Sequence, residues 1–236
     1  MSQKISAGLV PAIAGGVIGA ALTAVGLFLA GPSMLGERMV RETLVSNPEI
    51  IIDAGQALKD KQYAETLQPI RALLERPFFS SWKGAEKPDV TLTYFFDYAC
   101  GYCRMSNPDI ERLLKEDQGL RIVYRELPIL GPDSVAAARI SLAASKAGKF
   151  AAYHDALYAA GRPGPDTIAI AAKAAGIADQ PSQDPAQEAE LRSNMTLASQ
   201  LGATGTPLFV VGDRVMNAAV GYDALKEAIE AARKKS

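Results

Sequence analysis

The stretch FFDYACGYC (residues 95–103) contains both cysteines of the chain, Cys100 and Cys103. It overlaps the end of VTLTYFF (90–96), a run of β-branched and aromatic residues that predicts a buried strand. It leads into RMSNPDIERLLKED (104–117), whose apolar residues recur at helical spacing. The two cysteines therefore lie where a strand ends and a helix begins, and this position gives their C-x-x-C spacing a chemical meaning.

A helix N-terminus presents free N–H groups and partial positive charge, and both stabilise a thiolate. We therefore expect Cys100, the cysteine nearer to that end, to be the more exposed thiol and the nucleophile. Cys103, one turn into the helix, is expected to be buried and to act as the resolving thiol. Two intervening residues allow the pair to close a disulfide that exchanges readily.

Two other interpretations of the pair are half of a zinc site and a structural disulfide. Zinc needs further ligands, and the chain offers no other cysteine and a single histidine, His154. A disulfide that closes so short a loop would constrain the unfolded chain very little. The spacing therefore favours redox chemistry at the pair itself, and we predict no cofactor and no metal site. His154 lies in a helical stretch and is expected to be a structural residue.

The composition is that of an ordinary globular protein, with 236 residues, of which 48% are hydrophobic and 22% charged. That length suits one large domain, or one domain with additional segments. The formal net charge of −1 argues against a nucleic-acid-binding protein, which normally carries an excess of basic residues.

The N-terminal segment (1–36) is apolar, and residues 5–36 include no charged side chain. Its densest part, residues 12–31, would rise about 30 Å as a helix, which is roughly the thickness of the hydrocarbon core of a bilayer. We interpret the segment as an uncleaved membrane anchor, with a cleaved signal peptide and a buried core helix as alternatives. The anchor and the signal peptide would both export the rest of the chain.

Residues 37–76 are predicted to form an amphipathic helical arm. Within it, SNPE (46–49) combines capping side chains, a proline and an acid, as at the start of a helix. Apolar stripes follow through Ile51, Ala54 and Leu58, and then through Tyr63, Leu67, Ile70 and Leu74. Such stripes must be covered, either by the domain that follows or by copies of the arm in an oligomer. Residues 77–89 are predicted to be a linker or turn.

The remainder of the chain (90–236) predicts an α/β domain with a small mixed sheet and helices on its faces. Helical patterns fill residues 133–201, which we expect to be an insertion at a crossover between parallel neighbours. The expected strands after the cysteines are 120–127, 208–211 and 215–220, and the expected helices are 133–146, 150–160, 167–175, 186–201 and 222–234.

Three motifs, FFDYACGYC, YRELPILGPDS (124–134) and ATGTPLFVVGD (203–213), together resemble the DsbA-like branch of the thioredoxin-fold oxidoreductases. More narrowly, the chain is similar to the exported group that includes the suppressor-of-copper-sensitivity protein C type. The resemblance implies a thioredoxin-like domain over residues 90–236. It also implies an active pair and a substrate-binding frame that includes a cis proline facing the disulfide. The pair would be Cys100 and Cys103, and the frame Gly101, Tyr102, Thr206 and Pro207.

The resemblance further implies an exported thiol–disulfide oxidoreductase, acting either as an oxidase or as an isomerase or reductase. It would work in the periplasm, on the extracytoplasmic face of a bacterial inner membrane. Its partners would be substrate proteins with thiols or disulfides, a membrane redox partner, and copies of this chain through residues 37–76. The alternatives are a non-catalytic, chaperone-like protein and a copper-binding protein, because soft thiolates suit Cu(I).

One position departs from the pattern of the resembling family. Many of its members carry a buried acid six residues before the first cysteine, where this chain has Tyr94. A phenol, with a pKa near 10, stays protonated at neutral pH and is the poorer proton acceptor there. We therefore expect Tyr94 to change the rate or the potential of exchange.

Overall fold

The structure is a computed structural model, and it describes residues 36–180 and 184–234. The chain divides into two compact units, residues 1–57 and 58–236, which are described separately. The anchor or signal expected within residues 1–36 lies outside the described residues, apart from Gly36. Across 36–180 and 184–234, no helix is both long enough and apolar enough to cross a membrane.

The described part of the first unit is helical, with one helix over residues 36–46 and the first half of α2 (Glu49–Leu67). Asn47 and Pro48 separate the two helices. Its large apolar side chains lie open to solvent, among them Met39, Val40, Val45, Ile50, Ile51 and Ile52. The first of the two predicted stripes is therefore exposed in this chain.

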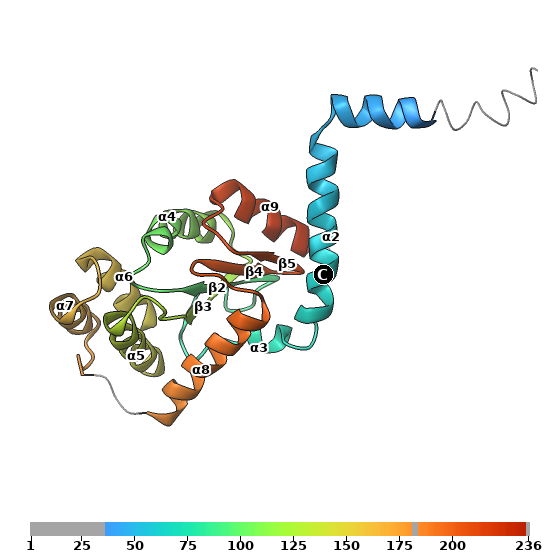
Figure 1. The fold of residues 1–236 in the computed structure, drawn as a ribbon. Coiled ribbons are helices and arrows are strands. Elements are labelled where there is room, and N and C mark those ends of the chain that lie inside the picture. The colour runs from blue at the N-terminus through green and yellow to red at the C-terminus, as the bar shows by residue number, and fades with distance from the viewer. Residues whose placement is uncertain (1–35, 181–183, 235–236) are drawn as a thin grey trace, which may run out of the picture. The chain divides into compact units, whose positions relative to one another are not determined.

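The second unit is built on a mixed sheet of five strands in the order β1-β3-β2-β4-β5 (Figure 1). The strands are β1 (Trp82–Gly84), β2 (Val90–Phe96), β3 (Leu120–Glu126), β4 (Leu208–Val211) and β5 (Arg214–Met216). β2 and β3 are parallel, whereas β1 pairs antiparallel with β3, β4 with β2, and β5 with β4. The predicted α/β mixed sheet is confirmed.

Helices cover both faces of this sheet (Figure 1). α4 (Gly101–Glu116) and α9 (Tyr222–Arg233) pack on one face, and α3 (Arg71–Glu75) and α8 (Pro185–Gln200) pack on the other. Three further helices lie between β3 and α8 in the sequence and pack against one another. They are α5 (Pro132–Lys146), α6 (Phe150–Ala160) and α7 (Pro165–Ala175). The bounds of α5, α6, α7, α8 and α9 lie within two residues of those predicted, whereas α4 begins three residues earlier than its predicted start.

Successive side chains of β2 point to opposite faces of the sheet, and one apolar cluster lies on each face. Tyr94 and Phe96 belong to the cluster on the side of α4 and α9, and Phe95 belongs to the other. The second cluster also contains Leu67 and Leu74, with Tyr63 and Ile70 packed against it. The second predicted stripe of the arm is therefore covered by the sheet, and the compact body begins at Leu58 rather than at residue 90.

Three expectations from the sequence are wrong. The segment 77–89 is not only a linker, because Trp82–Gly84 forms edge strand β1, a strand too short to show an alternating pattern. The inserted helices do not join parallel neighbours: α4 joins the parallel pair, and the insertion leads to β4, which runs antiparallel. The strand expected over 215–220 covers only residues 214–216, because the sequence that follows has no pairing strand.

Candidate active site

Cys100 occupies the N-cap of α4, directly after the loop that follows β2. Its sulfur accepts a hydrogen bond from the backbone N–H of Cys103 at 3.3 Å. The backbone of Cys100 is held on both sides, because its N–H donates to the carbonyl of Asp97 and its carbonyl accepts from the N–H of Arg104. The sequence places a thiol where the unpaired N–H groups of a helix converge, and such N–H groups stabilise a thiolate.

Cys103 lies one turn further along α4 and is fully buried, whereas Cys100 is 6% exposed. The predicted order of exposure is confirmed, although both thiols are largely covered. Burial raises the pKa of the Cys103 thiol to about 12. Interactions with the backbone of Asp97 and with the hydroxyl of Tyr94 oppose that rise.

The loop before β4 brings Thr206 and Pro207 to the cysteines from more than a hundred residues away in the sequence. The Thr206–Pro207 peptide bond is cis, as the resemblance implied. The Cys100 thiol donates to the carbonyl oxygen of Thr206 at 3.2 Å. Thr206 is half-buried and Pro207 is buried. The structure therefore brings Thr206 into direct contact with the first cysteine.

Gly101 and Tyr102 lie between the two thiols and are exposed. The Tyr102 side chain is 63% exposed, and Met105, one turn along α4, is 67% exposed. Tyr102 lies between the two cysteines in the sequence, so its exposed ring is next to the pair, and Met105 adds an exposed apolar side chain on the same helix.

Asp97 is a site residue whose role the sequence did not reveal. Its buried carboxylate accepts from the N–H of Ala99 at 2.8 Å. It also accepts from the N–H groups of Ile129 and Leu130 at 2.8 and 3.0 Å. One carboxylate thus fastens the loop before Cys100 to the loop that follows β3. The signal in the sequence was only an acid beside the motif, which is equally typical of a simple cap.

A second buried acid, Glu126, lies at the end of β3. The Tyr98 and Ser141 hydroxyls are 2.8 Å apart, and Ser141 donates to one Glu126 oxygen at 2.7 Å. The other oxygen has no hydrogen-bond partner among the described residues. Burial raises the pKa of the Glu126 carboxyl to about 8. Its place at a strand end, in YREL, gave no sign of this environment.

His154, predicted to be structural, is buried in a cage of aromatic rings. Its ring centroid lies 5.5 Å from that of Phe96, 5.0 Å from Tyr124 and 4.9 Å from Tyr158. Burial lowers the pKa of His154. The histidine is therefore held as a neutral packing residue, as expected.

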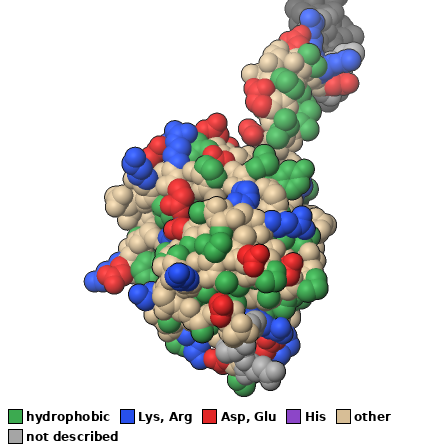
Figure 2. Space-filling model, turned by 90° about the vertical axis from the view of Figure 1, so that its left-hand side faces the viewer, with side chains coloured by type: hydrophobic (Ala, Val, Ile, Leu, Met, Phe, Trp, Pro, Cys, Tyr) green, Lys and Arg blue, Asp and Glu red, His purple; other side chains and the backbone are tan. Residues whose placement is uncertain are grey.

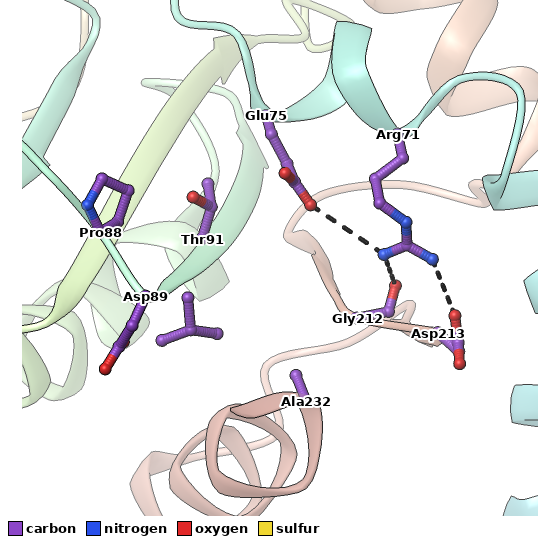
Figure 3. Close-up of a pocket in the computed structure, with 9 residues that line it drawn as sticks. Arg71, Glu75, Pro88, Asp89, Thr91, Gly212, Asp213 and Ala232 are labelled. Atoms are coloured by element: carbon purple, nitrogen blue, oxygen red, sulfur yellow. Dashed lines mark hydrogen bonds and ion pairs between the residues drawn. The ribbon is translucent and has the colours of Figure 1, made fainter. Parts of the chain in front are cut away.

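A separate hollow of about 460 Å³ lies at the other end of β2 (Figure 3). Its Arg71 is already engaged, because it donates to the carbonyl of Gly212 at 2.6 Å and to the Asp213 carboxylate at 2.7 Å. Over residues 36–180 and 184–234, no group of three or more His, Cys, Asp or Glu side chains could hold a metal ion. Charges of both signs are interspersed on the face that Figure 2 shows. The cysteine pair, with its contacts to the α4 backbone and to Thr206, is therefore the candidate site.

Comparison with known families gives two matches along the chain. The family described as the DSBA-like thioredoxin domain matches residues 91–230. The family described as the copper resistance protein ScsC N-terminal domain matches residues 37–65. The two matches follow each other along the sequence, separated by residues 66–90, and together extend over most of the described residues.

Solved structures give the same result. The fold is similar to a periplasmic thioredoxin-like protein from Salmonella enterica serovar Typhimurium, with a TM-score of 0.65 and 30% identity over 70% of this chain and 96% of that one. It is also similar to Proteus mirabilis ScsC in a transitional conformation, with a TM-score of 0.67 and 28% identity over 88% and 97% of the two chains.

Among curated proteins, the chain is 27% identical over 158 residues to the Na(+)/H(+) antiporter NhaA 3 of Salinispora tropica. The matched part is 64% of this chain but 24% of that protein. The chain therefore spans about a quarter of the length of this relative.

Proposed function

Because the chain belongs to the DsbA-like thioredoxin domain family, we propose that it exchanges disulfides with substrate proteins through Cys100 and Cys103. The resemblance seen in the sequence is confirmed, and it supports an oxidoreductase of the thiol–disulfide class. One observation carries the assignment of the pair: the Cys100 sulfur receives an N–H from the first turn of α4. This contact stabilises Cys100 as the attacking or leaving thiolate.

The proposed reaction has two steps. The Cys100 thiolate attacks a substrate disulfide, so that a Cys100–substrate bond forms as the substrate S–S bond breaks and one substrate thiolate leaves. The Cys103 thiolate then attacks the Cys100 sulfur, which closes the Cys100–Cys103 disulfide and releases the second substrate sulfur as a thiolate. The protein is oxidised by two electrons and the substrate disulfide is reduced. The same steps in reverse oxidise a substrate dithiol, and the proton of each thiol goes to solvent or to the leaving thiolate.

We propose that Gly101, Tyr102, Thr206 and Pro207 frame the substrate peptide. The Thr206 carbonyl lies beside the Cys100 sulfur, where it could accept a backbone N–H from an extended segment. The exposed Tyr102 ring, two residues after Cys100 on α4, offers apolar contact to the same peptide. No cofactor takes part, because the disulfide is itself the redox centre.

The proposed location is the periplasm, with residues 1–36 as the anchor and a membrane redox partner to reset the pair. The Salmonella relative is a periplasmic protein, which supports export. We propose that copies of the chain associate through the exposed apolar residues of 36–58, the part of the arm that the sheet leaves open. An assembly of this kind favours an isomerase, since several active sites can hold one misfolded substrate.

The test is a trapping experiment with the full chain. Cys103→Ser is expected to accumulate a mixed disulfide with substrate proteins that dithiothreitol releases, because the resolving thiol is gone. Cys100→Ser, the matched control, is expected to accumulate none. Equal trapping by both variants, or by neither, would overturn the assignment. Alkylation of thiols in quenched cells then gives the direction: an oxidised pair indicates an oxidase, and a reduced pair an isomerase or reductase.

A further inference from the structure

Tyr94 is the buried side chain of β2 that approaches the second cysteine. Its hydroxyl donates to the carbonyl oxygen of Cys103 at 3.3 Å. The same hydroxyl acts on the Cys103 thiol in the direction that lowers its pKa, which favours the ionised form. One phenol is therefore hydrogen-bonded to the backbone of the residue that, in the proposed function, resolves the mixed disulfide, and it also influences the ionisation of that residue's sulfur.

The ring of Tyr94 is held in one place by other aromatic rings. It stacks on Phe209 of β4 with centroids 4.8 Å apart and an interplanar angle of 15°. Phe96 and Tyr124 lie 5.4 and 5.7 Å away. The ring is fully buried. Because the ring is fixed, the hydroxyl hydrogen is the part of this side chain that can still rotate. Its rotation can direct the hydrogen toward either the carbonyl oxygen or the sulfur of Cys103.

The two acceptors differ in strength. A hydroxyl-to-carbonyl bond of 3.3 Å is long, since such bonds are normally about 2.7–2.8 Å. A thiolate would be a charged acceptor, and charge-assisted hydrogen bonds are the stronger kind. The hydroxyl hydrogen is therefore expected to turn from the carbonyl to the sulfur when Cys103 loses its proton.

Tyr94 cannot instead take up that proton at neutral pH. Burial raises the pKa of the phenol well above its ordinary value of 10, and nearby Tyr158, Cys103 and Tyr124 add to the rise. Cys100 and Tyr158 are the other ionisable side chains that act on this pair from α4 and α6. A protonated phenol has an O–H to give, so its role is that of a donor.

We propose that the Tyr94 hydroxyl is the hydrogen-bond donor that stabilises the Cys103 thiolate while it forms or leaves during exchange. This inference rests on the proposed function and assigns the group that assists its second step. The Cys103 thiolate attacks the Cys100 sulfur, the new disulfide closes, and the substrate thiolate leaves. In the reverse direction the same hydroxyl stabilises Cys103 as the leaving thiolate.

The size of the effect follows from two opposing terms. A hydrogen bond to a charged group shifts the pKa of that group by about one to two pH units. Its loss would reduce the thiolate fraction accordingly, but a more basic thiolate attacks faster, with a Brønsted coefficient of about 0.4–0.5. The net expectation for Tyr94→Phe is a resolution step about three- to tenfold slower.

The experiment uses the reduced full chain and a chromogenic aromatic disulfide, dithiobis-nitrobenzoate. Attack by Cys100 releases one coloured thiolate, and resolution by Cys103 releases a second. Tyr94→Phe is expected to slow the second release by the stated factor between pH 7 and 9 and to leave the first unchanged. The reduction potential at pH 7 is expected to stay the same, because Cys103 is uncharged in both the dithiol and the disulfide.

Tyr124→Phe is the matched control, since it removes one oxygen from a neighbouring buried tyrosine whose hydroxyl has no partner among the described residues. It is expected to change neither phase. Replacing Tyr94 by difluorotyrosine keeps the hydroxyl and makes it a stronger donor, so the second phase should become faster. Equal second phases in wild type and Tyr94→Phe, or equal slowing in Tyr124→Phe, would overturn the role of Tyr94. A wild type that releases no second thiolate would instead overturn the proposed function.

Discussion

The buried carboxyl of Glu126 is expected to make the free energy of unfolding depend on pH. Burial raises the pKa of this carboxyl from an ordinary 4.5 to about 8 in the folded protein. Between these values the folded protein keeps a proton that the unfolded chain has released. The stabilisation is therefore complete below about pH 4.5 and is lost as pH rises to about 8. At about 1.4 kcal/mol for each pH unit, the loss totals about 5 kcal/mol, of which about 4 kcal/mol falls between pH 5 and pH 8.5.

Glu126→Gln tests this reasoning, because an amide has the shape of the protonated acid and does not ionise. Urea unfolding of both proteins at pH 5 and pH 8.5, with the thiols reduced, measures the two free energies of unfolding. The variant should gain about 4 kcal/mol relative to wild type between the two pH values. The exposed Glu230→Gln is the control and should show no such change. The reasoning would be refuted if the difference in free energy of unfolding between wild type and Glu126→Gln changed by less than about 1 kcal/mol from pH 5 to pH 8.5.

Two further predictions concern stability and assembly. Arg125 is fully buried, and its guanidinium donates to five acceptors: the carbonyls of Leu73, Leu74 and Arg76, the side chain of Asn194 and the carboxylate of Glu190. Because Arg125→Met leaves these acceptors without their donor, it should lower the free energy of unfolding by about 3–5 kcal/mol. Urea unfolding measures this, and a loss below about 1 kcal/mol would contradict it. Ile51→Glu places a charge on the exposed apolar stripe of α2 and, if copies associate as proposed, should lower the molar mass in light scattering to that of a single chain. An unchanged molar mass would show that association does not use this stripe.

The elements around the cysteines could be predicted because their signals are local. The run VTLTYFF forms β2 over the same residues that its composition indicated, and α4 begins directly after the first cysteine. The order of exposure of Cys100 and Cys103 follows from their places on one helix turn. The same holds for His154, whose helical, apolar neighbourhood predicted a packing role.

The features that escaped prediction depend on partners distant in the sequence. Arg125 alternates with apolar residues on β3 as a solvent-facing residue would, but α3 and α8 cover it and supply its acceptors. Asp97 accepts hydrogen bonds from a loop that lies 32 residues further along the chain. Glu126 meets a serine on α5, and nothing in the sequence near either residue marks the pair. Such contacts become visible only once the sheet order is known.

The hydrogen bond from the Cys100 thiol to the carbonyl of Thr206 links ligand access to oxidation state. A disulfide has no S–H, so oxidation removes this donor and leaves the carbonyl free to accept from another chain. A protonated Cys100 thiol thus competes with a peptide N–H for this carbonyl, whereas the Cys100 thiolate and the disulfide do not. Extended peptides should therefore bind more tightly to the thiolate and disulfide forms than to the protonated dithiol.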